Sequence, residues 1–597
     1  MFLATIDWLI IAAYLVFSLI IGIWFAKQAG KDSTEFFAAG KNMPWWLLGI
    51  SMVATTFSTD TPNLVADIVR TQGVAGNWGW WAFLLTGMLT VFVYAQLWKR
   101  SGVLTDVEFY ELRYSGKSAA FLRGFRAIYL GFLFNVIVMA TVSLAAIKIG
   151  SVLMGLTPFQ TILIAGTVTV IYSSLGGLKS ILITDFFQFF LSFLGGLAAA
   201  YYALQLPEVG GLNGLLTSPQ VIPKLNIFPD FNNPSEMLGL LIIPLAVQWW
   251  SVYYPGSEPG GGGYIAQRMF AAKDENHAVG AVFFFNAAHF ALRPWPWIIV
   301  GLASLIVFPD LASMKEAFPT ASGVAANDMA YPAMLTFLPT GLIGLVLASL
   351  IAAYMSTIST HLNWGSSYLV NDFYKRFVRP GSSEKELVLV GRISTVVLMI
   401  FAGALALVME SALDNFQILL QIGAGTGLIF ILRWFWWRIN AASEIAAMIV
   451  SFLVALYFQF LHTYTSLPEF TSWQELITGV VITTIAWIIT MYLTRPTDSK
   501  TLEEFIKLVR PGGPGWVKVK NESTSNFDSI DGKSDGWIVP QGILCMVLGT
   551  IAIYGTLLAT GYWLYGNMVP AISLTIITII DSYLLMISWK KLLQFRK

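Results

Sequence analysis

Long apolar runs recur along this chain of 597 residues, and they restrict its fold more than any other feature. Many reach the roughly 20 residues that an α-helix needs to cross the hydrocarbon core of a bilayer. Hydrophobic residues make up 56% of the chain and charged residues 12%, with a mean hydropathy of +0.68. Because a soluble protein of this size is less apolar, we predict an all-α polytopic membrane protein. About fifteen spans are expected, near residues 6–26, 45–70, 78–98, 125–153, 158–176, 180–204, 236–256, 277–308, 338–371, 388–410, 414–438, 443–463, 474–494, 538–562 and 568–590.

The rest of the composition argues against several classes of function. A net charge of +1 gives no sign of nucleic-acid binding. The single cysteine, Cys545, excludes a disulfide framework and a cysteine-based metal site. The histidines lack metal-ligand spacing, and no nucleophile constellation indicates an enzyme. We therefore expect a protein whose partners are the lipid bilayer and small solutes, with no nucleic acid.

The distribution of lysine and arginine predicts the orientation of the spans. With the N-terminus outside, 30 of the 35 basic residues fall in segments on the cytoplasmic side. This one-sidedness follows the positive-inside rule, and a missed span would disturb it in every later segment. We expect a multi-pass protein of the cell membrane, with its N-terminus outside and its C-terminus in the cytoplasm. The polar connections at 205–235 and 495–537 are too short to be independent domains.

The second predicted span is interrupted by polar residues. Its middle, residues 55–62, is dense in hydroxyl groups and contains Asp60 and Pro62. A carboxylate within the membrane is costly and usually functional. Proline lacks a backbone donor, so Pro62 frees a carbonyl group in the preceding turn. A helix rich in Ser and Thr that packs tightly on its neighbours is the alternative interpretation.

The seventh predicted span ends in a second interruption, "YYPGSEPGGGGYIAQR", at residues 253–268. Its two prolines and five glycines indicate either a plain loop or a broken helix. The second and seventh spans are five helices apart, so they cross the bilayer in opposite directions. Paired breaks at matching places in two inverted halves indicate the binding site of a secondary transporter. Two unrelated breaks are the alternative.

Hydroxyl side chains gather on the ninth predicted span. Ser356, Ser359 and Thr360 share one helix face, with Thr357 beside them and Ala353 one turn earlier. Against carbonyl groups freed in another helix, these hydroxyls would form an oxygen cage for a hard cation such as Na⁺. Hydrogen bonding between helices is the alternative, and the cluster alone does not decide between them.

Several motifs along about the first 440 residues occur together, in the order of one known family. They are "FFAAGKNMPWWLLGISMVATTFST" at 36–59, "YSSLGGLKSILITDFFQ" at 172–188, "YIAQR" at 264–268, "AAYMSTIST" and "SSYLVNDFYKR" within 352–376, and "FQILLQ" and "FWWRIN" within 416–440. Through them the chain resembles the sodium:solute symporter family, which includes sodium/glucose, proline and sialic acid transporters.

The resemblance implies a five-plus-five inverted-repeat core, as in the leucine transporter, with one extra N-terminal helix and about four extra C-terminal helices. The expected division of the chain follows from this core. It comprises an extra helix and inside loop at 1–44, a first repeat at 45–204, an outside loop at 205–235, a second repeat at 236–440 and C-terminal helices at 441–597.

The resemblance also assigns the cation ligands. The main Na⁺ site would be formed by backbone oxygens of Ala54, Phe57 and Ala353 and by the hydroxyl groups of Ser356 and Thr357. Some family members hold a second Na⁺. Its ligands would be Ser356 together with Asp185, Ser359 and Thr360. An acid near the cytoplasmic end of its helix, where it costs little, is the alternative role for Asp185.

Substrate contacts in the family come from the broken spans and from three further spans. The matching candidates here are Asp60, Thr61, Trp80, Tyr254, Glu258, Arg293, Gln417 and Gln421. Trp80 stands where glucose cotransporters offer an acid, which argues against glucose-like recognition. Arg293, an arginine within an apolar span, favours an acidic sugar or another carboxylate. An interface belt of Trp78, Trp80 and Trp81, and an ion pair of Arg293 with Asp60 or Glu258, are the alternatives.

These features together predict a sodium-coupled secondary symporter. We expect it to import a small polar solute, a sugar or sugar acid by preference, by alternating access. A proton-coupled, amino-acid or carboxylate symporter of the same fold is one alternative, and a membrane solute sensor is another. A sensor would usually carry a signalling domain, which the sequence does not show.

Overall fold

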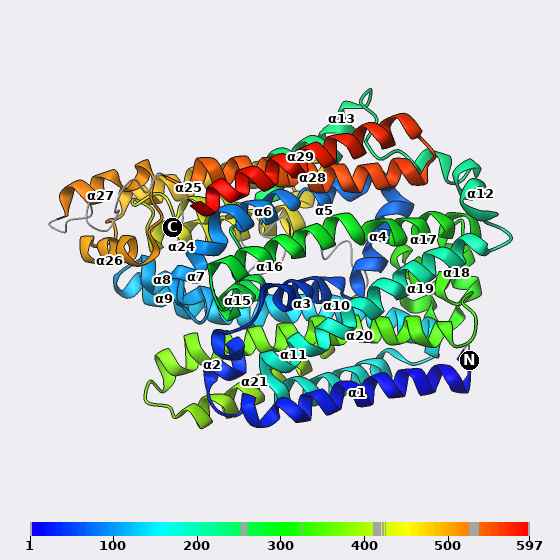
Figure 1. Ribbon diagram of the computed structural model, residues 1–597, viewed down its shortest axis with the longest axis horizontal. Helices are drawn as coiled ribbons and strands as arrows, with labels where there is room; N and C mark the ends of the chain where they lie inside the picture. Colours follow the sequence, from blue (N-terminus) through cyan, green and yellow to red (C-terminus); the bar gives the residue numbers. More distant parts are fainter. Residues whose placement is uncertain are drawn as a thin grey trace.

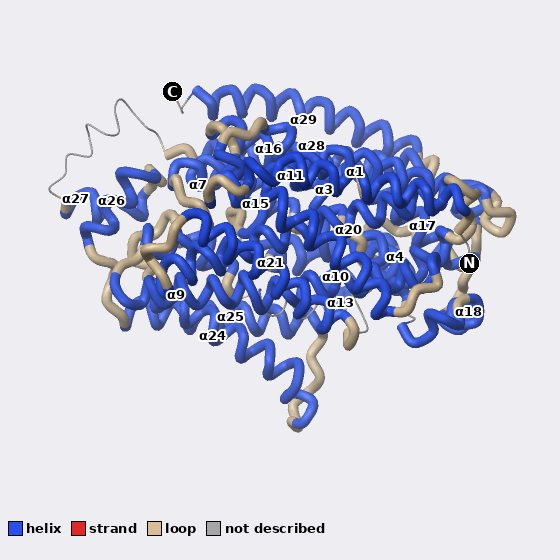
Figure 2. Tube along the Cα trace, turned by 90° about the horizontal axis from the view of Figure 1, so that it is seen from below, coloured by secondary structure: helices blue, strands red, loops and turns tan. Residues whose placement is uncertain are grey.

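Helices dominate the computed structural model of this chain, which describes residues 3–251, 259–324, 326–409, 420, 423, 425–523 and 537–594. Figure 2 shows helices and loops, and the described residues contain one isolated β-bridge, between Met43 and Ala272, but no strand. Eleven described helices are long and apolar enough to cross a membrane, and two shorter apolar helices occupy Trp45–Phe57 and Pro234–Ala246. The predicted all-α polytopic architecture is confirmed.

The helices of the first 217 residues are α1 (Thr5–Ala29), α2 (Ser33–Ala38), α3 (Trp45–Phe57), α4 (Asp60–Gln72), α5 (Trp78–Trp81), α6 (Leu84–Leu89), α7 (Ala95–Ser101), α8 (Phe109–Arg113), α9 (Gly116–Ile128), α10 (Asn135–Ile149), α11 (Pro158–Gln205) and α12 (Gly211–Thr217). The central helices are α13 (Pro234–Met237), α14 (Ile243–Ala246), α15 (Gly263–Ala271), α16 (Glu275–Ala287), α17 (Pro294–Val307), α18 (Leu311–Ala317), α19 (Ala330–Leu335), α20 (Leu342–Ser367), α21 (Glu384–Ala406) and α23 (Gly427–Leu432). The last helices are α24 (Ala441–Leu456), α25 (Ser472–Leu493), α26 (Ser499–Val509), α27 (Val517–Glu522), α28 (Val539–Leu564) and α29 (Met568–Gln594).

Short π-helical and 3₁₀ segments connect or extend these helices. The π-helical segments are η3 (Thr90–Tyr94), η5 (Tyr129–Phe134), η6 (Gly150–Met154), η8 (Leu238–Ile242), η10 (Ala288–Leu292), η13 (Tyr368–Val378) and η14 (Tyr457–Leu461). The 3₁₀ segments are η1 (Ala39–Lys41), η2 (Val74–Asn77), η4 (Asp106–Glu108), η7 (Ile222–Lys224), η9 (Gln248–Trp250), η11 (Pro319–Val324), η12 (Asn327–Met329), η15 (His462–Tyr464) and η16 (Pro514–Trp516).

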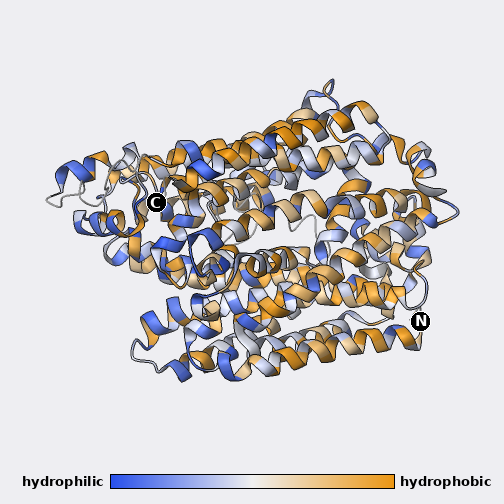
Figure 3. Cartoon of the chain, viewed as in Figure 1, coloured by the Kyte–Doolittle hydropathy of each residue, from blue (hydrophilic) through white to orange (hydrophobic). Residues whose placement is uncertain are grey.

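The long helices run along a common direction, and hydrophilic segments gather at the two ends of the bundle (Figures 1 and 3). Helix α1 lies along one side of the bundle and the hairpin of α28 and α29 along the opposite side (Figure 1). Helix α1 packs on α11 and α20, whereas α28 packs on α6 and η3. The hydrophobic band between two polar ends is the arrangement that a bilayer requires.

The second predicted span is broken where the sequence indicated. Helix α3 ends at Phe57 and α4 begins at Asp60. Between them Ser58 has a φ of 29° and a ψ of 151°, a backbone conformation that residues with a side chain rarely adopt. The chain therefore leaves its helical path sharply at this one residue and resumes it two residues later.

Four other predicted spans either meet at a sharp bend or lie partly outside the described chain. The spans predicted at 158–176 and 180–204 share the label α11, but they are two helices that meet in a sharp bend at Gly177, where the backbone is not helical, as the two separate predictions indicated. There φ is 59°, and an added Cβ would lie 2.9 Å from the carbonyl oxygen of Phe36, so glycine is required. In the seventh span α14 ends at Ala246 and α15 begins at Gly263, while residues 252–258 lie outside the described chain. The span predicted at 414–438 also lies partly outside it.

The cytoplasmic loop predicted at 495–537 contains a packed cap rather than a simple connection. Helix α26 buries Phe505 and Ile506 against the ends of α7 and α8. The guanidinium group of Arg113 lies 5.5 Å from the ring centre of Phe505 and 4.9 Å from that of Trp516. Cation–π contacts of this kind fasten the cap to the helix bundle.

The extra N-terminal helix is attached to the bundle by Asp7. This carboxylate is fully buried and accepts hydrogen bonds from the backbone N–H groups of Gly341 (2.7 Å) and Gly344 (2.9 Å) at the start of α20. The first N–H groups of a helix have no partner within it, so an acid from α1 satisfies them and complements the helix dipole. An added Cβ at Gly344 would lie 2.5 Å from Cα of Asp7, which shows how closely the two helices approach.

We predict that Asp7→Ala lowers the free energy of unfolding by about 2–3 kcal/mol, because it strands buried donors at the start of α20. The measurement is the thermal unfolding midpoint of the purified protein in detergent. Asp310→Ala is the matched control, since Asp310 caps the exposed helix α18 and its loss should cost about 1 kcal/mol or less. Equal losses from the two variants would contradict this role for Asp7.

Candidate functional site

The broken end of α3 presents carbonyl oxygens to the interior of the bundle. A helix that ends at Phe57 leaves its last four carbonyl groups without intrahelical partners. The hydroxyl of Thr357 donates to the Thr55 carbonyl (2.6 Å), and that of Thr61 donates to the Thr56 carbonyl (3.3 Å). Among the described residues no donor contacts the carbonyl oxygens of Ala54 and Phe57. These two buried oxygens are therefore available to an ion.

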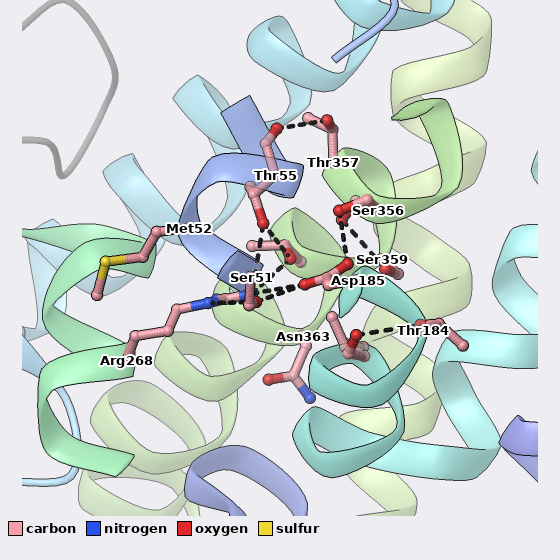
Figure 4. A network of polar contacts seen from close by, with 12 residues as sticks. Ser51, Met52, Thr55, Thr184, Asp185, Arg268, Ser356, Thr357, Ser359 and Asn363 are labelled. Atoms are coloured by element: carbon pink, nitrogen blue, oxygen red, sulfur yellow. Dashed lines mark hydrogen bonds and ion pairs between the residues drawn. The ribbon is translucent and has the colours of Figure 1, made fainter. Parts of the chain in front are cut away.

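Helix α20 places its hydroxyl groups beside this break (Figure 4). Thr357 also donates to the Ala353 carbonyl at 3.0 Å, and Ser356 donates to Oδ1 of Asp185 at 2.6 Å. Ser356, Thr357, Ser359 and Thr360 are all at most 2% exposed. Asp185 is fully buried, so its predicted alternative as a cheap acid at a helix end is wrong. Ser51 of α3 donates to its other oxygen, Oδ2.

Arg268 of α15 lies among the same oxygen atoms and carries a fixed positive charge. Its guanidinium donates to Thr360 Oγ1 at 2.7 Å and to Ser51 Oγ at 3.2 Å, and lies 3.8 Å from Oδ2 of Asp185. The side chains of Arg268 and Asp185 are both inaccessible to solvent. Gln267 of α15 donates to Asn363 of α20 at 2.9 Å. The inner half of the seventh span is thereby joined to α3, α11 and α20 at one point.

A second polar group surrounds Arg293 on the other side of α3. Its guanidinium donates to the Val53 carbonyl (3.3 Å) and to Thr56 Oγ1 (3.2 Å) and contacts the His289 ring. It also lies 4.7 Å from the ring centre of Phe57. Arg293 is 1% exposed. Backbone, hydroxyl, imidazole and aromatic groups therefore stabilise its positive charge in place of water. It lies next to the residues that form the break.

The structure brings Trp80 and Asp60 near this group. Trp80 stacks on Phe290 and meets the His289 ring edge-on at a centroid distance of 5.7 Å. Trp80 is 8% exposed and Trp78 and Trp81 less, so the alternative of an interface belt is wrong. Asp60 begins α4 and accepts a hydrogen bond from Ser58. The remaining substrate candidates, Tyr254, Glu258, Gln417 and Gln421, lie outside the described residues.

Polar contacts also close the end of the bundle that holds α2 and α8. Asp106 in η4 accepts a hydrogen bond from the backbone N–H of Gly263, the first residue of α15, at 2.8 Å, and another from Tyr368. The adjacent Thr105 donates to Asp372 at 2.6 Å. Tyr368 and Asp372 both lie in η13, which continues α20. The connection between α7 and α9 therefore holds the inner half of the seventh span against α20.

Sequence reasoning missed three contributors to the site. Arg268 ends the motif "YIAQR" but was assigned no role beyond a cytoplasmic basic residue, although it is fully buried. Ser51 stands one turn before Thr55, a spacing that puts both hydroxyls on one face of the span. His289 stands one turn before Arg293 in an apolar span, where any ionisable side chain signals a functional site.

Comparison with known proteins indicates the same class of protein as the predicted motifs and the fold. The profile of the Sodium:solute symporter family matches residues 36–451. The sodium/glucose cotransporter of Vibrio parahaemolyticus is 27% identical over 500 residues, which cover 80% of this chain and 90% of that protein. The sodium/myo-inositol cotransporter 2 of Oryctolagus cuniculus is 26% identical over 485 residues, covering 75% of this chain and 69% of that protein.

A solved structure supports the fold. The substrate-bound, outward-open state of a Na⁺-coupled sialic acid symporter covers 83% of this chain and 99% of its own, with a TM-score of 0.65 and 21% sequence identity. The match of the family profile over most of the chain identifies the class. The chain belongs to the sodium:solute symporter family, and it is a sodium-coupled transporter of the membrane with a leucine-transporter-like core.

We expect the contributions of Arg268 and Asp185 to the free energy of unfolding to depend on each other. Arg268→Gln leaves a buried carboxylate without its cation, so we predict a loss of about 3–5 kcal/mol in unfolding free energy. Arg268→Gln combined with Asp185→Asn should recover most of it. Arg379→Gln is the control, because Arg379 is 65% exposed and its ion pair with Glu386 should be worth less than about 1 kcal/mol. Thermal unfolding measures all three, and equal loss in the single and double variants would argue against the pairing.

Proposed function

We propose that this symporter imports a small polar solute, preferably a sugar or a sugar acid, by alternating access. Inward movement of Na⁺ supplies the work, at about 2.3 kcal/mol per charge per 100 mV in addition to the concentration gradient. The observation that carries the proposal is the break that ends α3 at Phe57 beside the hydroxyl groups of α20, where Thr357 donates to the Thr55 carbonyl. Hydroxyl and carbonyl oxygens are the ligands that hard cations prefer.

The proposed main Na⁺ site comprises the carbonyl oxygens of Ala54, Phe57 and Ala353 and the hydroxyl oxygens of Ser356 and Thr357. Both hydroxyls donate their protons elsewhere, Thr357 to carbonyl groups and Ser356 to Asp185. Their lone pairs therefore stay free to coordinate a cation. Because the ligands come from the end of α3 and from α20, a bound ion would hold these helices together.

Replacing both Ser356 and Thr357 with Ala removes two of the five proposed ligands. We predict at least a tenfold loss of sodium affinity in uptake, which corresponds to about 1.4 kcal/mol. The matched control is Ser366→Ala with Ser367→Ala on the same helix, whose hydroxyls donate to carbonyl groups of their own helix. An unchanged sodium dependence in the first variant would place the site elsewhere.

A second Na⁺ site would use Asp185, Ser356, Ser359 and Thr360. Its oxygen atoms are buried together, which supports the proposal. The guanidinium of Arg268 contacts both Asp185 and Thr360, so a second ion would share these oxygens with a fixed positive charge. Binding of that ion therefore requires Arg268 to withdraw from Asp185.

Asp185→Asn distinguishes one Na⁺ from two. With two ions, the wild-type Hill coefficient for sodium in proteoliposome uptake exceeds one, and the variant lowers it towards one. Asp310→Asn, in the exposed connection before α18, serves as the control and should leave the coefficient unchanged. A wild-type coefficient of one that the Asp185 variant does not alter would leave Asp185 as the structural partner of Arg268.

The solute is proposed to bind beside Trp80, Arg293, Asp60 and Thr61, with Tyr254, Glu258, Gln417 and Gln421 as further candidates. Relatives named for glucose and myo-inositol support a polyhydroxylated solute. Trp80 offers an aromatic face and Arg293 a planar donor fork, a combination suited to a sugar ring that carries a carboxylate. Arg293 has two alternative roles in this proposal: it binds the solute, or it forms an ion pair with an acid.

We predict that Arg293→Lys weakens solute binding at least tenfold while sodium affinity stays unchanged, because lysine keeps the charge but lacks the fork. If Arg293 instead serves an ion pair, Arg293→Ala lowers stability and a second change, Asp60→Asn or Glu258→Gln, restores it. Solute affinity, sodium affinity and thermal stability are measured for each variant. Normal solute affinity in a well-folded Arg293→Ala protein would exclude both roles.

The proposed orientation has the N-terminus outside and the C-terminus in the cytoplasm of a cell-membrane protein. The two chain ends lie at opposite ends of the bundle, which supports an odd number of spans (Figure 1). The end with α2, α8 and α26 carries many of the basic residues, as expected for a cytoplasmic surface.

The decisive experiment is uptake into proteoliposomes of radiolabelled sugars, sugar acids, amino acids and carboxylates, with sodium or choline outside. Sodium-driven accumulation of a sugar or sugar acid supports the proposal. Accumulation driven by a pH gradient without sodium would favour proton coupling, and uptake restricted to amino acids would exclude the proposed solute class.

A further inference from the structure

An apolar cavity of about 160 Å³ lies between α1, α10, α11 and α20, apart from the polar groups described above. Exposed side chains stand at its mouth, Trp8 of α1 (36% exposed) and Ile164 of α11 (51%). Its deep wall includes Met355 of α20 and Thr59 at the break of the second span, which are 1% and 2% exposed. The cavity therefore runs from the outer surface of the bundle to the break.

The occupant of this cavity must be apolar. Aliphatic side chains such as Ile11, Leu15, Leu347 and Leu350 form most of the lining. Water needs two or more polar partners to stay in a cavity, whereas apolar cavities of about this size bind small hydrocarbons. The lining offers a hydrocarbon many dispersion contacts and offers water few hydrogen bonds.

The mouth of the cavity identifies the source of that occupant. It opens between α1, which is long and apolar enough to span the membrane, and the first half of α11, which contributes Ile164, Ala165 and Val168 to the lining. Ile164 lines it, and on the same helix Phe159 and Leu163 are 62% and 56% exposed, as expected for a helix in contact with lipid. The cavity is thus continuous with the face that this membrane protein presents to the bilayer, where acyl chains are the abundant apolar molecules.

The shape of the cavity suits an extended chain. On α20 the lining runs from Leu347 to Met355, which at 1.5 Å per residue covers about 12 Å. We propose that the cavity is a binding site for a lipid acyl chain, which enters from the bilayer between α1 and α11 and ends beside Thr59 and Met355.

The deep end of this site adjoins the proposed cation ligands. Met355 precedes Ser356 in α20, and Thr59 follows Ser58, the residue at which the second span leaves its helical path. A chain that fills the space between them stabilises the observed arrangement of the break relative to α20. It shifts the conformational equilibrium only as far as it binds this arrangement better than others.

The test uses vesicles of phosphatidylcholine doped with a phosphatidylcholine whose acyl chain carries a diazirine. The purified protein is reconstituted, irradiated, digested and mapped by mass spectrometry. We expect adducts on Tyr354, Met355 or Thr59, which a lipid outside the bundle cannot reach because each is at most 2% exposed. Adducts confined to exposed residues, such as Ile164 and Ile400, would overturn the proposal.

Cavity-filling variants make the result specific. Ala165→Phe places a large side chain in the cavity and should reduce the deep adducts at least fivefold, while labelling of Ile400 continues. Val168→Phe fills the same space and serves if the first variant does not fold. Ala13→Phe is the control, since Ala13 is exposed on α1 and does not line the cavity. Deep adducts that persist in both filled variants would overturn the proposal, and the readout is independent of transport.

Discussion

The carbonyl groups freed at the end of α3 constrain much of the structure around them. Within a bilayer no water is present to bond an exposed backbone group, so irregular backbone persists only where protein groups or a cavity satisfy it. Ser58 turns the chain out of its helix, and Thr357 and Thr61 supply donors to two of the carbonyls that this turn frees. The carbonyls of Ala54 and Phe57 are the ones that we propose as cation ligands. The rule that forbids broken helices in lipid thus favours our proposal of an ion site at a break that is buried in protein.

Helix α20 is the element against which the other parts are positioned. Its first N–H groups bind Asp7 of the extra helix, its middle binds α3 and α11 through Thr357 and Ser356, and its continuation binds η4 through Tyr368. The broken second span and the connection beside α8 therefore both contact one helix, on which we also propose that Na⁺ binds. An ion that joins α3 to α20 is able to influence the distant contact between Asp106 and α15 through this helix, which is the form of coupling that a symporter requires.

Two arginines show how much of the site the sequence could predict. Arg293 was recognisable because it stands within an apolar span, where a charge is expensive. Arg268 was not, since it follows a loop and fits the basic pattern of the cytoplasmic side. It becomes part of the site because α15 folds back into the bundle and brings its guanidinium to Asp185, 83 residues away in the chain. The bounds of the uninterrupted spans were similarly predictable, and the two helices that meet at Gly177 were both indicated, but the sharp bend between them appears only in the structure.

The sequence by itself determined the helical class, the approximate spans, the position of the break before Asp60 and the hydroxyl face of α20. These properties depend on local hydrophobicity and on the backbone conformations that single residues can adopt. Both can be read from the order of residues in the chain. Only the tertiary structure decided that Asp185 is buried beside Ser51 and Ser356, that Trp80 faces His289 and that the loop after α25 folds into a cap. Those outcomes depend on contacts between residues far apart in the chain, because several neighbouring helices together decide which polar side chains meet and which face lipid.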